Sequence, residues 1–243
     1  MTPLLPTRTY LSFRTSAHRI QMYNVWSELD YNVVTFDYRG YGDSEGTISE
    51  RGIVSDSRLV YKYVLHHSGK NTVLIWGHSM GTGVAVHLVS DLCLDKTPPD
   101  GLVLESPFNN FKDFTISSIK GKPLSWMFQE MLQRYLLDPL KKAGIDMNSD
   151  ERISKCVEMP IFRQALLEAI LSLYFDLILI CHFGKKAQCI VWVVKRLLLH
   201  NDRLLQDAAV ASKRDIKYVE FPAARNYKHH CIYLAPELVT LIP

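Results

Sequence analysis

The sequence GHSMG at residues 77–81 has the residue types and spacing of a serine nucleophile held in a sharp turn. The apolar run 73–76 before it predicts a strand, and the apolar pattern from 84 to 92 after it predicts a buried helix. The two glycines leave room for a strained turn that lifts Ser79 Oγ off the sheet edge. The N–H of Met80 would then face the oxygen that becomes negative in acyl transfer. We therefore predict that Ser79 is a nucleophile, the alternative being a chance spacing of glycines.

A serine nucleophile needs a histidine base, and that base needs a carboxylate to orient it. In this arrangement the histidine follows the last strand of the sheet. His229 and His230 follow the last strand predicted, at 216–221. We expect His229 to be the base, with His230 as the second choice and two ordinary surface histidines as the alternative.

The orienting carboxylate should follow the strand before the last one. Asp176 comes directly after the apolar run 169–175 and is the acid we expect. Asp202 is its rival, and Glu105, after an earlier strand, is a weaker third choice. Spacing alone does not separate Asp176 from Asp202.

Short apolar runs alternate with amphipathic segments through the first half of the chain. Strands are predicted at 33–36, 73–76 and 102–104, and helices at 17–29 and 50–67. Such alternation indicates an α/β fold with a doubly wound, mostly parallel sheet. Because ligands bind at the carboxyl ends of parallel strands, the expected position of Ser79 suits an active site.

Composition limits the class of protein. A chain of 243 residues with 47% hydrophobic and 22% charged residues suits one domain spanning 1–243. A net charge of +3 without a basic run argues against nucleic-acid binding. Five scattered cysteines predict reduced thiols and no zinc site, so we expect no metal and no organic cofactor. No signal peptide and no uncharged apolar run of about 18 residues is apparent, so no membrane anchor is expected.

Two segments depart from the alternating pattern. Residues 109–158 have no strand pattern and are rich in large apolar residues, which suits a helical cap over an apolar substrate; an ordinary helix pair is the alternative. Residues 162–205 fit no single period and are predicted to hold irregular inserts.

Several motifs together resemble the α/β-hydrolase-domain lipases that act on lysophosphatidylserine and monoacylglycerols. They are FDYRGYGDSEG, GHSMGTG, LVLESPFNNF, LLDPLKKAGI and NYKHHCIYLAPEL. The resemblance implies an α/β-hydrolase fold, a lipid ester substrate and an acyl-enzyme on Ser79. It matches His229 to the family's catalytic histidine and favours Asp176 over Asp202. It also implies contact with a membrane surface, in the endoplasmic reticulum.

The sequence also departs from that family. The family's His-Gly dipeptide, whose loop supplies a second oxyanion N–H, is not found in YLSFRTSAHRI at 10–20, and the family's first strands are expected to be missing. This departure motivates a second hypothesis, a catalytically impaired protein that acts as a binding or membrane-associated module. A thioesterase or peptidase on the same scaffold is a third, because a fold does not fix a substrate.

Overall fold

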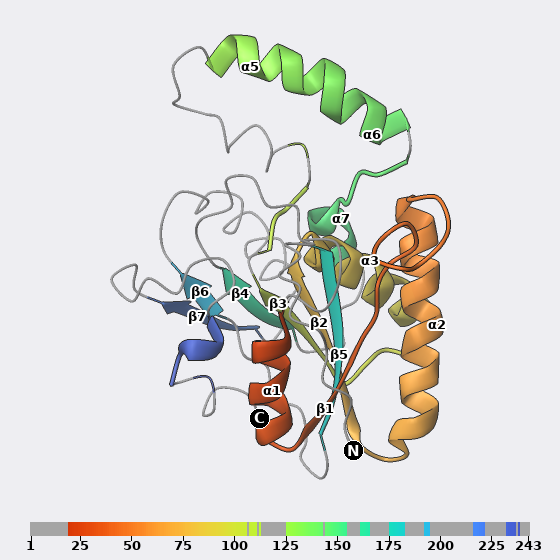
Figure 1. The fold of residues 1–243 in the computed structure, drawn as a ribbon, viewed down its shortest axis with the longest axis vertical. Helices are drawn as coiled ribbons and strands as arrows, with labels where there is room; N and C mark the ends of the chain where they lie inside the picture. The colour runs from red at the N-terminus through yellow and green to blue at the C-terminus, as the bar shows by residue number, and fades with distance from the viewer. Residues whose placement is uncertain are drawn as a thin grey trace.

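The computed structural model describes residues 19–105, 107–110, 112, 125–142, 144–154, 161–165, 175–182, 192–194, 216–221, 232–236 and 238. For the strands beyond residue 160 the description is of the backbone. Figure 1 shows a twisted sheet with helices packed against it and one long helical segment standing away from it.

The first half of the chain alternates strands and helices as the sequence predicts. Its elements are α1 (Ile20–Glu28), β1 (Tyr31–Thr35), α2 (Glu50–Ser68), β2 (Thr72–Ser79), α3 (Met80–Leu94) and β3 (Gly101–Glu105). The four strands that follow are β4 (Ile161–Ala165), β5 (Phe175–His182), β6 (Trp192–Val194) and β7 (Ile216–Phe221). The predicted last strand, 216–221, is confirmed at the same bounds.

The sheet is mostly parallel, with strand order β1-β5-β2-β3-β4-β6-β7. Strands β2, β3, β4, β6 and β7 pair in parallel, so their carboxyl ends share one edge. Strand β5 lies between β1 and β2 and runs antiparallel to both. Its amino end therefore lies at the edge where β2 ends, and this reversal of one strand was not predicted.

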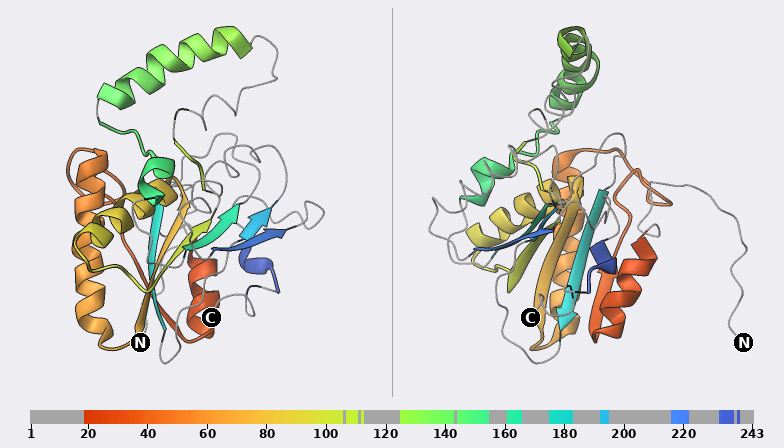
Figure 2. Two further views of the ribbon diagram at one scale, coloured as in Figure 1. Left: turned by 180° about the vertical axis from the view of Figure 1, so that it is seen from behind. Right: turned by 90° about the vertical axis from the view of Figure 1, so that its left-hand side faces the viewer.

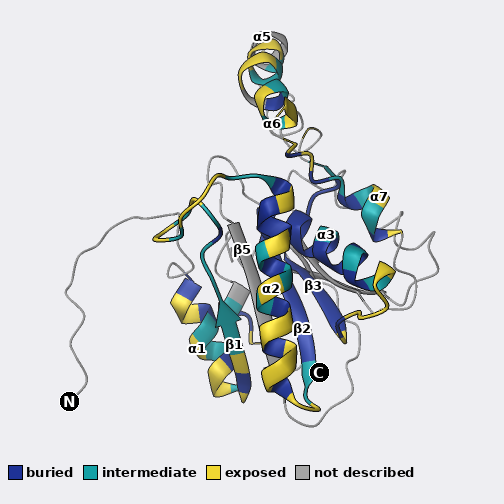
Figure 3. Cartoon of the chain, turned by 90° about the vertical axis from the view of Figure 1, so that its right-hand side faces the viewer, coloured by how far each residue is buried: buried dark blue, intermediate teal, exposed yellow. Residues whose placement is uncertain are grey.

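Helices cover both faces of the sheet. In the right-hand view of Figure 2, α1 lies on one side of the sheet and α3 on the other. Helix α2 packs against α3 and β2. The core between these layers holds large aromatic side chains, among them Trp26 and Trp76, whose ring centroids are 4.9 Å apart. Figure 3 shows α3 almost wholly buried and α2 buried along one stripe only, as expected for a central and a peripheral helix.

Residues 125–142 form one helical arm that stands beyond the carboxyl edge of the sheet (Figure 1). It consists of α5 (Ser125–Leu132), a π-helical turn (Gln133–Leu137) and α6 (Asp138–Lys142). The chain then returns to the body and forms the short helix α7 (Ser149–Ile153), which packs against α3. Within the part of the chain that the structure describes, no helix is both long and apolar enough to cross a membrane.

Three expectations need correction. Asp176 does not follow a strand, because it is the second residue of β5. Within the segment 162–205, where irregular inserts were expected, residues 162–165 and 192–194 are instead strand residues of the sheet. The cysteines are not all reduced, because Cys93, near the end of α3, forms a disulfide.

Candidate active site

Ser79 lies at a strained turn between β2 and α3. It is the last residue of β2, and its backbone has φ of 50° and ψ of −118°, in the region that residues with a side chain seldom adopt. Met80 begins α3, so its N–H belongs to the first helical turn, where amides lack a carbonyl partner within the helix. The predicted turn is confirmed in its backbone geometry.

Close packing explains why this turn requires glycine before the serine. A Cβ at Gly77 would lie 2.5 Å from the carbonyl oxygen of Gly81 and 2.7 Å from the Cα of Thr82. The Thr82 hydroxyl donates a 2.6 Å hydrogen bond to the carbonyl of Ser79 and so satisfies a buried acceptor at the turn. Thr82 was not among the site residues predicted from the sequence.

Ser79 is largely buried. Only 6% of the residue is exposed, and Met80 is 5% exposed. The turn is therefore present, and most of the surface of Ser79 is buried.

A buried charge cluster lies directly behind the turn. We call it the elbow cluster; it comprises Arg19, Trp76, His78 and Glu105. The guanidinium of Arg19 donates to both oxygens of Glu105 at 2.8 and 2.6 Å, and the indole N–H of Trp76 donates to Glu105 Oε2 at 2.9 Å. His78 Nε2 lies 3.8 Å from Glu105 Oε1. Glu105, the third choice for the acid, is therefore bound inside the core beside the residue that precedes Ser79.

A second buried carboxylate lies at the start of α2. We call its surroundings the foot cluster; it comprises Glu50, His87, Asp146, Met147 and Arg152. Glu50 Oε1 lies 2.7 Å from His87 Nδ1 and accepts from Arg152 at 2.5 Å. Glu50 Oε2 accepts from the N–H groups of Asp146 and Met147, both at 2.8 Å.

The charge of Glu50 is stabilised despite its burial. Burial acts to raise its pKa, but the hydrogen bonds from His87, Met147 and Asp146, together with the charge of Arg152, outweigh it and lower the pKa to about 2. Glu50 was not among the site residues predicted from the sequence. Its only signal was an acidic residue beginning a helix after a capping serine, Ser49.

The structure locates the backbone of one expected triad partner. Asp176 pairs across the sheet with His78, one residue from the Ser79–Phe175 pair. It therefore lies at the edge where Ser79 lies, although it enters that edge at the start of a strand. His229, His230 and Asp202 lie outside the described residues. The carboxyl end of β7 nevertheless lies at this same edge, because β7 runs parallel to β2 through β3 and β4.

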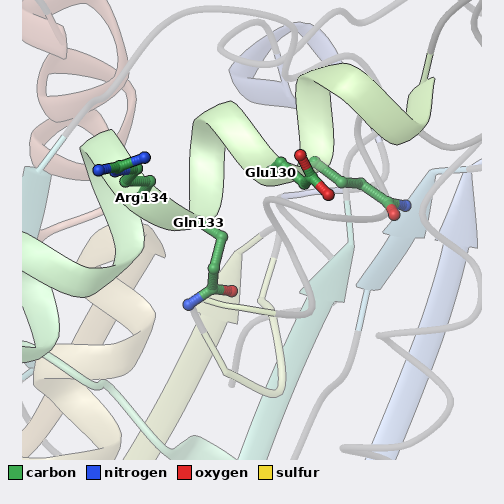
Figure 4. Close-up of a pocket in the computed structure, with 4 residues that line it drawn as sticks. Glu130, Gln133 and Arg134 are labelled. Atoms are coloured by element: carbon green, nitrogen blue, oxygen red, sulfur yellow. The ribbon is translucent and has the colours of Figure 1, made fainter.

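The helical arm carries a hollow lined by Gln129, Glu130, Gln133 and Arg134. Figure 4 shows that the labelled side chains all come from this one helix. Gln133 donates to Asp138 at 2.6 Å, so part of this polar lining is already paired. The hollow is remote from Ser79 in sequence and contains no nucleophile. Among the described side chains, no group of three His, Cys, Asp or Glu could hold a metal ion.

The chain resembles several curated and solved proteins. It is 38% identical over 233 residues to the rat lysophosphatidylserine lipase ABHD12, covering 94% of this chain and 52% of that protein. It is 30% identical to human protein ABHD12B, covering 94% and 56%. The chain thus spans about half the length of the curated relatives it matches.

Solved structures agree on the fold. An α/β hydrolase from Vibrio vulnificus superposes with a TM-score of 0.54 at 17% identity, covering 85% of this chain and 62% of that one. A lipase-esterase related protein from Clostridium acetobutylicum gives 0.51 at 14% identity, covering 92% and 90%. The family described as serine aminopeptidase, S33, matches residues 16–169. The nucleophile turn, the mostly parallel sheet and these matches show that the chain belongs to this family of α/β hydrolases.

Proposed function

We propose that the protein is a serine esterase or lipase that hydrolyses carboxylic esters of lipids through an acyl-enzyme on Ser79. The observation that carries this proposal is the positive φ of Ser79 at the junction of β2 and α3. A strained turn of this kind presents the serine hydroxyl beyond the edge of the sheet, where it can attack a carbonyl.

In the proposed mechanism, Ser79 Oγ attacks the ester carbonyl while His229 takes its proton. Asp176 orients His229 and stabilises its cation, and the Met80 N–H binds the oxyanion. His229 then gives the proton to the departing alcohol, and water activated by His229 hydrolyses the acyl-enzyme. The backbone position of Asp176 beside His78 supports this assignment, as does the direction of β7 toward the same edge. The mechanism needs no metal and no organic cofactor.

We propose a lysophospholipid or monoacylglycerol as the substrate. The relatives named as lysophosphatidylserine lipases support this class of substrate. Residues 109–158, including the helical arm, would form the cap. On that arm Met131 is 50% and Tyr135 73% exposed, so apolar surface is available to an acyl chain.

We also propose that the protein works at a membrane surface, in the endoplasmic reticulum. The exposed Met131 and Tyr135 lie on the same helical arm as Arg134, Lys141 and Lys142. Apolar side chains flanked by cations suit the interface of an anionic bilayer. Flotation with phosphatidylserine vesicles tests this: binding should weaken for Met131→Ser/Tyr135→Ser and in high salt, and binding only to neutral vesicles would contradict it.

A fluorophosphonate probe tests the nucleophile. Labelling should occur in the wild type and disappear in Ser79→Ala. Ser90→Ala is the matched control, because Ser90 is a buried serine of α3, the helix that follows Ser79. Equal labelling of Ser79→Ala, or none in the wild type, would end the proposal.

A second function, a non-catalytic binding module, is favoured by one observation, the 6% exposure of Ser79. Ester turnover that disappears in His229→Ala would exclude a binding module. If Asp176→Asn also impairs turnover and Asp202→Asn does not, Asp176 is the acid of the triad.

The family is described as an aminopeptidase, so amide and thioester substrates also need to be tested. Rates on paired ester, thioester and amide substrates with the same acyl group would rank them.

A further inference from the structure

The helical arm joins the body through a helix end of defined geometry. Gly144, with φ of 71°, follows α6; its N–H donates to the carbonyl of Lys141, and the N–H of Ile145 donates to that of Leu140. This is the Schellman pattern, which fixes the direction in which a chain leaves a helix. The next residues, Asp146 and Met147, are therefore held at a set position relative to the last turn of the arm.

The Glu50 carboxylate holds these next residues in turn. It accepts from the N–H groups of Asp146 and Met147 and from the side chain of Arg152, which comes from α7. It also bonds His87, which lies two turns beyond Ser79 on α3. One carboxylate thus connects the start of α2, the nucleophile helix and the residues where the arm returns to the body.

Packing adds to these bonds at one place on the nucleophile helix. Met147 is 1% exposed and adopts φ of 47°, a strained value for a residue with a side chain. A Cβ on Gly83 would lie 3.0 Å from the Cβ of Met147, so the foot of the arm rests directly on α3 four residues after the nucleophile. In Figure 3 the buried start of α2, α3 and α7 lie next to one another at this place.

We propose that Glu50 is a positioning residue that fixes the foot of the helical arm against α3 and thereby sets the length of acyl chain that is hydrolysed. Its effect on placement stands on the contacts alone, whereas its effect on chain length rests on the proposed ester hydrolysis at Ser79. A short acyl group reacts at the turn without reaching the arm. A long one also needs the apolar surface of the arm in its place.

The first test uses Glu50→Gln, which keeps the shape of the side chain but gives up the charge that Arg152 and the two N–H groups bind. Asp56→Asn is the matched control, since Asp56 is an acid of the same helix paired with Arg39 outside the foot cluster. We expect kcat/KM for an oleoyl ester to fall about tenfold in Glu50→Gln, roughly the value of one charge-assisted hydrogen bond. Turnover of a butyryl ester should change little, and Asp56→Asn should preserve the ratio between the two esters.

A second variant guards against simple misfolding. Arg152→Gln removes the partner that α7 contributes and leaves both backbone hydrogen bonds to Glu50. It should therefore lower the ratio of oleoyl to butyryl ester turnover less strongly than Glu50→Gln does. If both esters lose activity in proportion to the loss of folded protein, Glu50 is merely structural and the inference about chain length is overturned.

Hydrogen exchange decides the placement whether or not esters are hydrolysed. The amides of Asp146 and Met147 should exchange faster in Glu50→Gln, while those in the middle of α3 keep the wild-type rate. Unchanged exchange at 146–147 would overturn the role of Glu50 at the foot. Absence of all ester turnover together with faster exchange there would instead refute the proposed function and the chain-length effect, and leave the placement standing.

Discussion

The elbow cluster and the foot cluster each surround a buried carboxylate near the nucleophile, yet they connect different parts of the molecule. Glu105 is fully buried and bonds to the side chains of Arg19 and Trp76, which both belong to the body. Glu50 is 2% exposed and bonds to two backbone N–H groups of the segment that returns from the arm. The elbow cluster supports the turn at Ser79 from within the body. The foot cluster holds the segment that returns from the helical arm and so fixes the arm relative to that turn.

This difference separates stability from substrate selection. Removing one partner of a wholly buried ion pair leaves an uncompensated charge in the core, so we expect the cost to appear in folding. Weakening the foot cluster releases a segment at the rim of the body, so we expect the cost to appear first in local opening. Three predictions test this distinction.

The largest effect should come from the elbow cluster. Arg19→Met leaves the Glu105 carboxylate without its cation, and we expect the free energy of unfolding to fall by about 3–5 kcal/mol. Denaturant unfolding measures it. In the double variant Arg19→Met/Glu105→Gln no ionised group is left in the pair, so part of the loss should be recovered. A double variant less stable than Arg19→Met would show that the Arg19–Glu105 pair is not the source of the cost.

A smaller effect, dependent on pH, should come from the foot cluster. The pKa of Glu50 is about 2 in the folded protein, below its ordinary value of 4.5, so its ionised form stabilises the fold above about pH 4.5. Stability is lost as the pH falls from there through about 2, by an amount on the order of 3 kcal/mol. The groups facing Glu50 are Arg152 and His87, and His87 Nε2 lies 4.0 Å from Asp91.

Thermal unfolding between pH 5 and pH 2.5 measures this loss. The slope should be shallower in Glu50→Gln, which has no carboxyl to protonate. The opening should begin locally, so exchange at 146–147 should accelerate before that in β2. If amide exchange at 146–147 and in β2 accelerates at the same pH, the foot cluster does not open separately from the body.

The sequence predicted the elements around Ser79 well for a physical reason. Between residues 17 and 105, apolar runs and amphipathic periods reflect burial within one continuous stretch. Gly77 of GHSMG stands where a side chain would clash with the turn itself. The structure confirms α1, α2, β1, β2, α3 and β3 close to the predicted bounds. Each of these signals is local.

The rest depended on contacts that no local pattern contains. Residues 175–182 are mostly apolar and suit a strand. Their antiparallel position between β1 and β2 depends on pairing with strands far away in the sequence. That is why Asp176 was expected after a strand and lies within one. The partners of Glu50 are about 40 to 100 residues away in the chain, so its role could not be read from its neighbours.

The smallest effect should come from Gly83→Ala, at the contact between foot and nucleophile helix. The added methyl would lie 3.0–3.2 Å from Met147 Cβ, Sδ and Cγ, which is tight, but a methionine side chain can shift. Alanine favours a helix over glycine by about 1 kcal/mol, and overpacking costs about 1–3 kcal/mol, so we expect a net loss near 1 kcal/mol. Because the added methyl contacts Met147, we expect the amides of residues 146–147 to exchange faster than the loss of global stability alone would predict. A large loss of global stability without a local change there would mean that Met147 is part of the rigid body, and the contrast between the two clusters would fail.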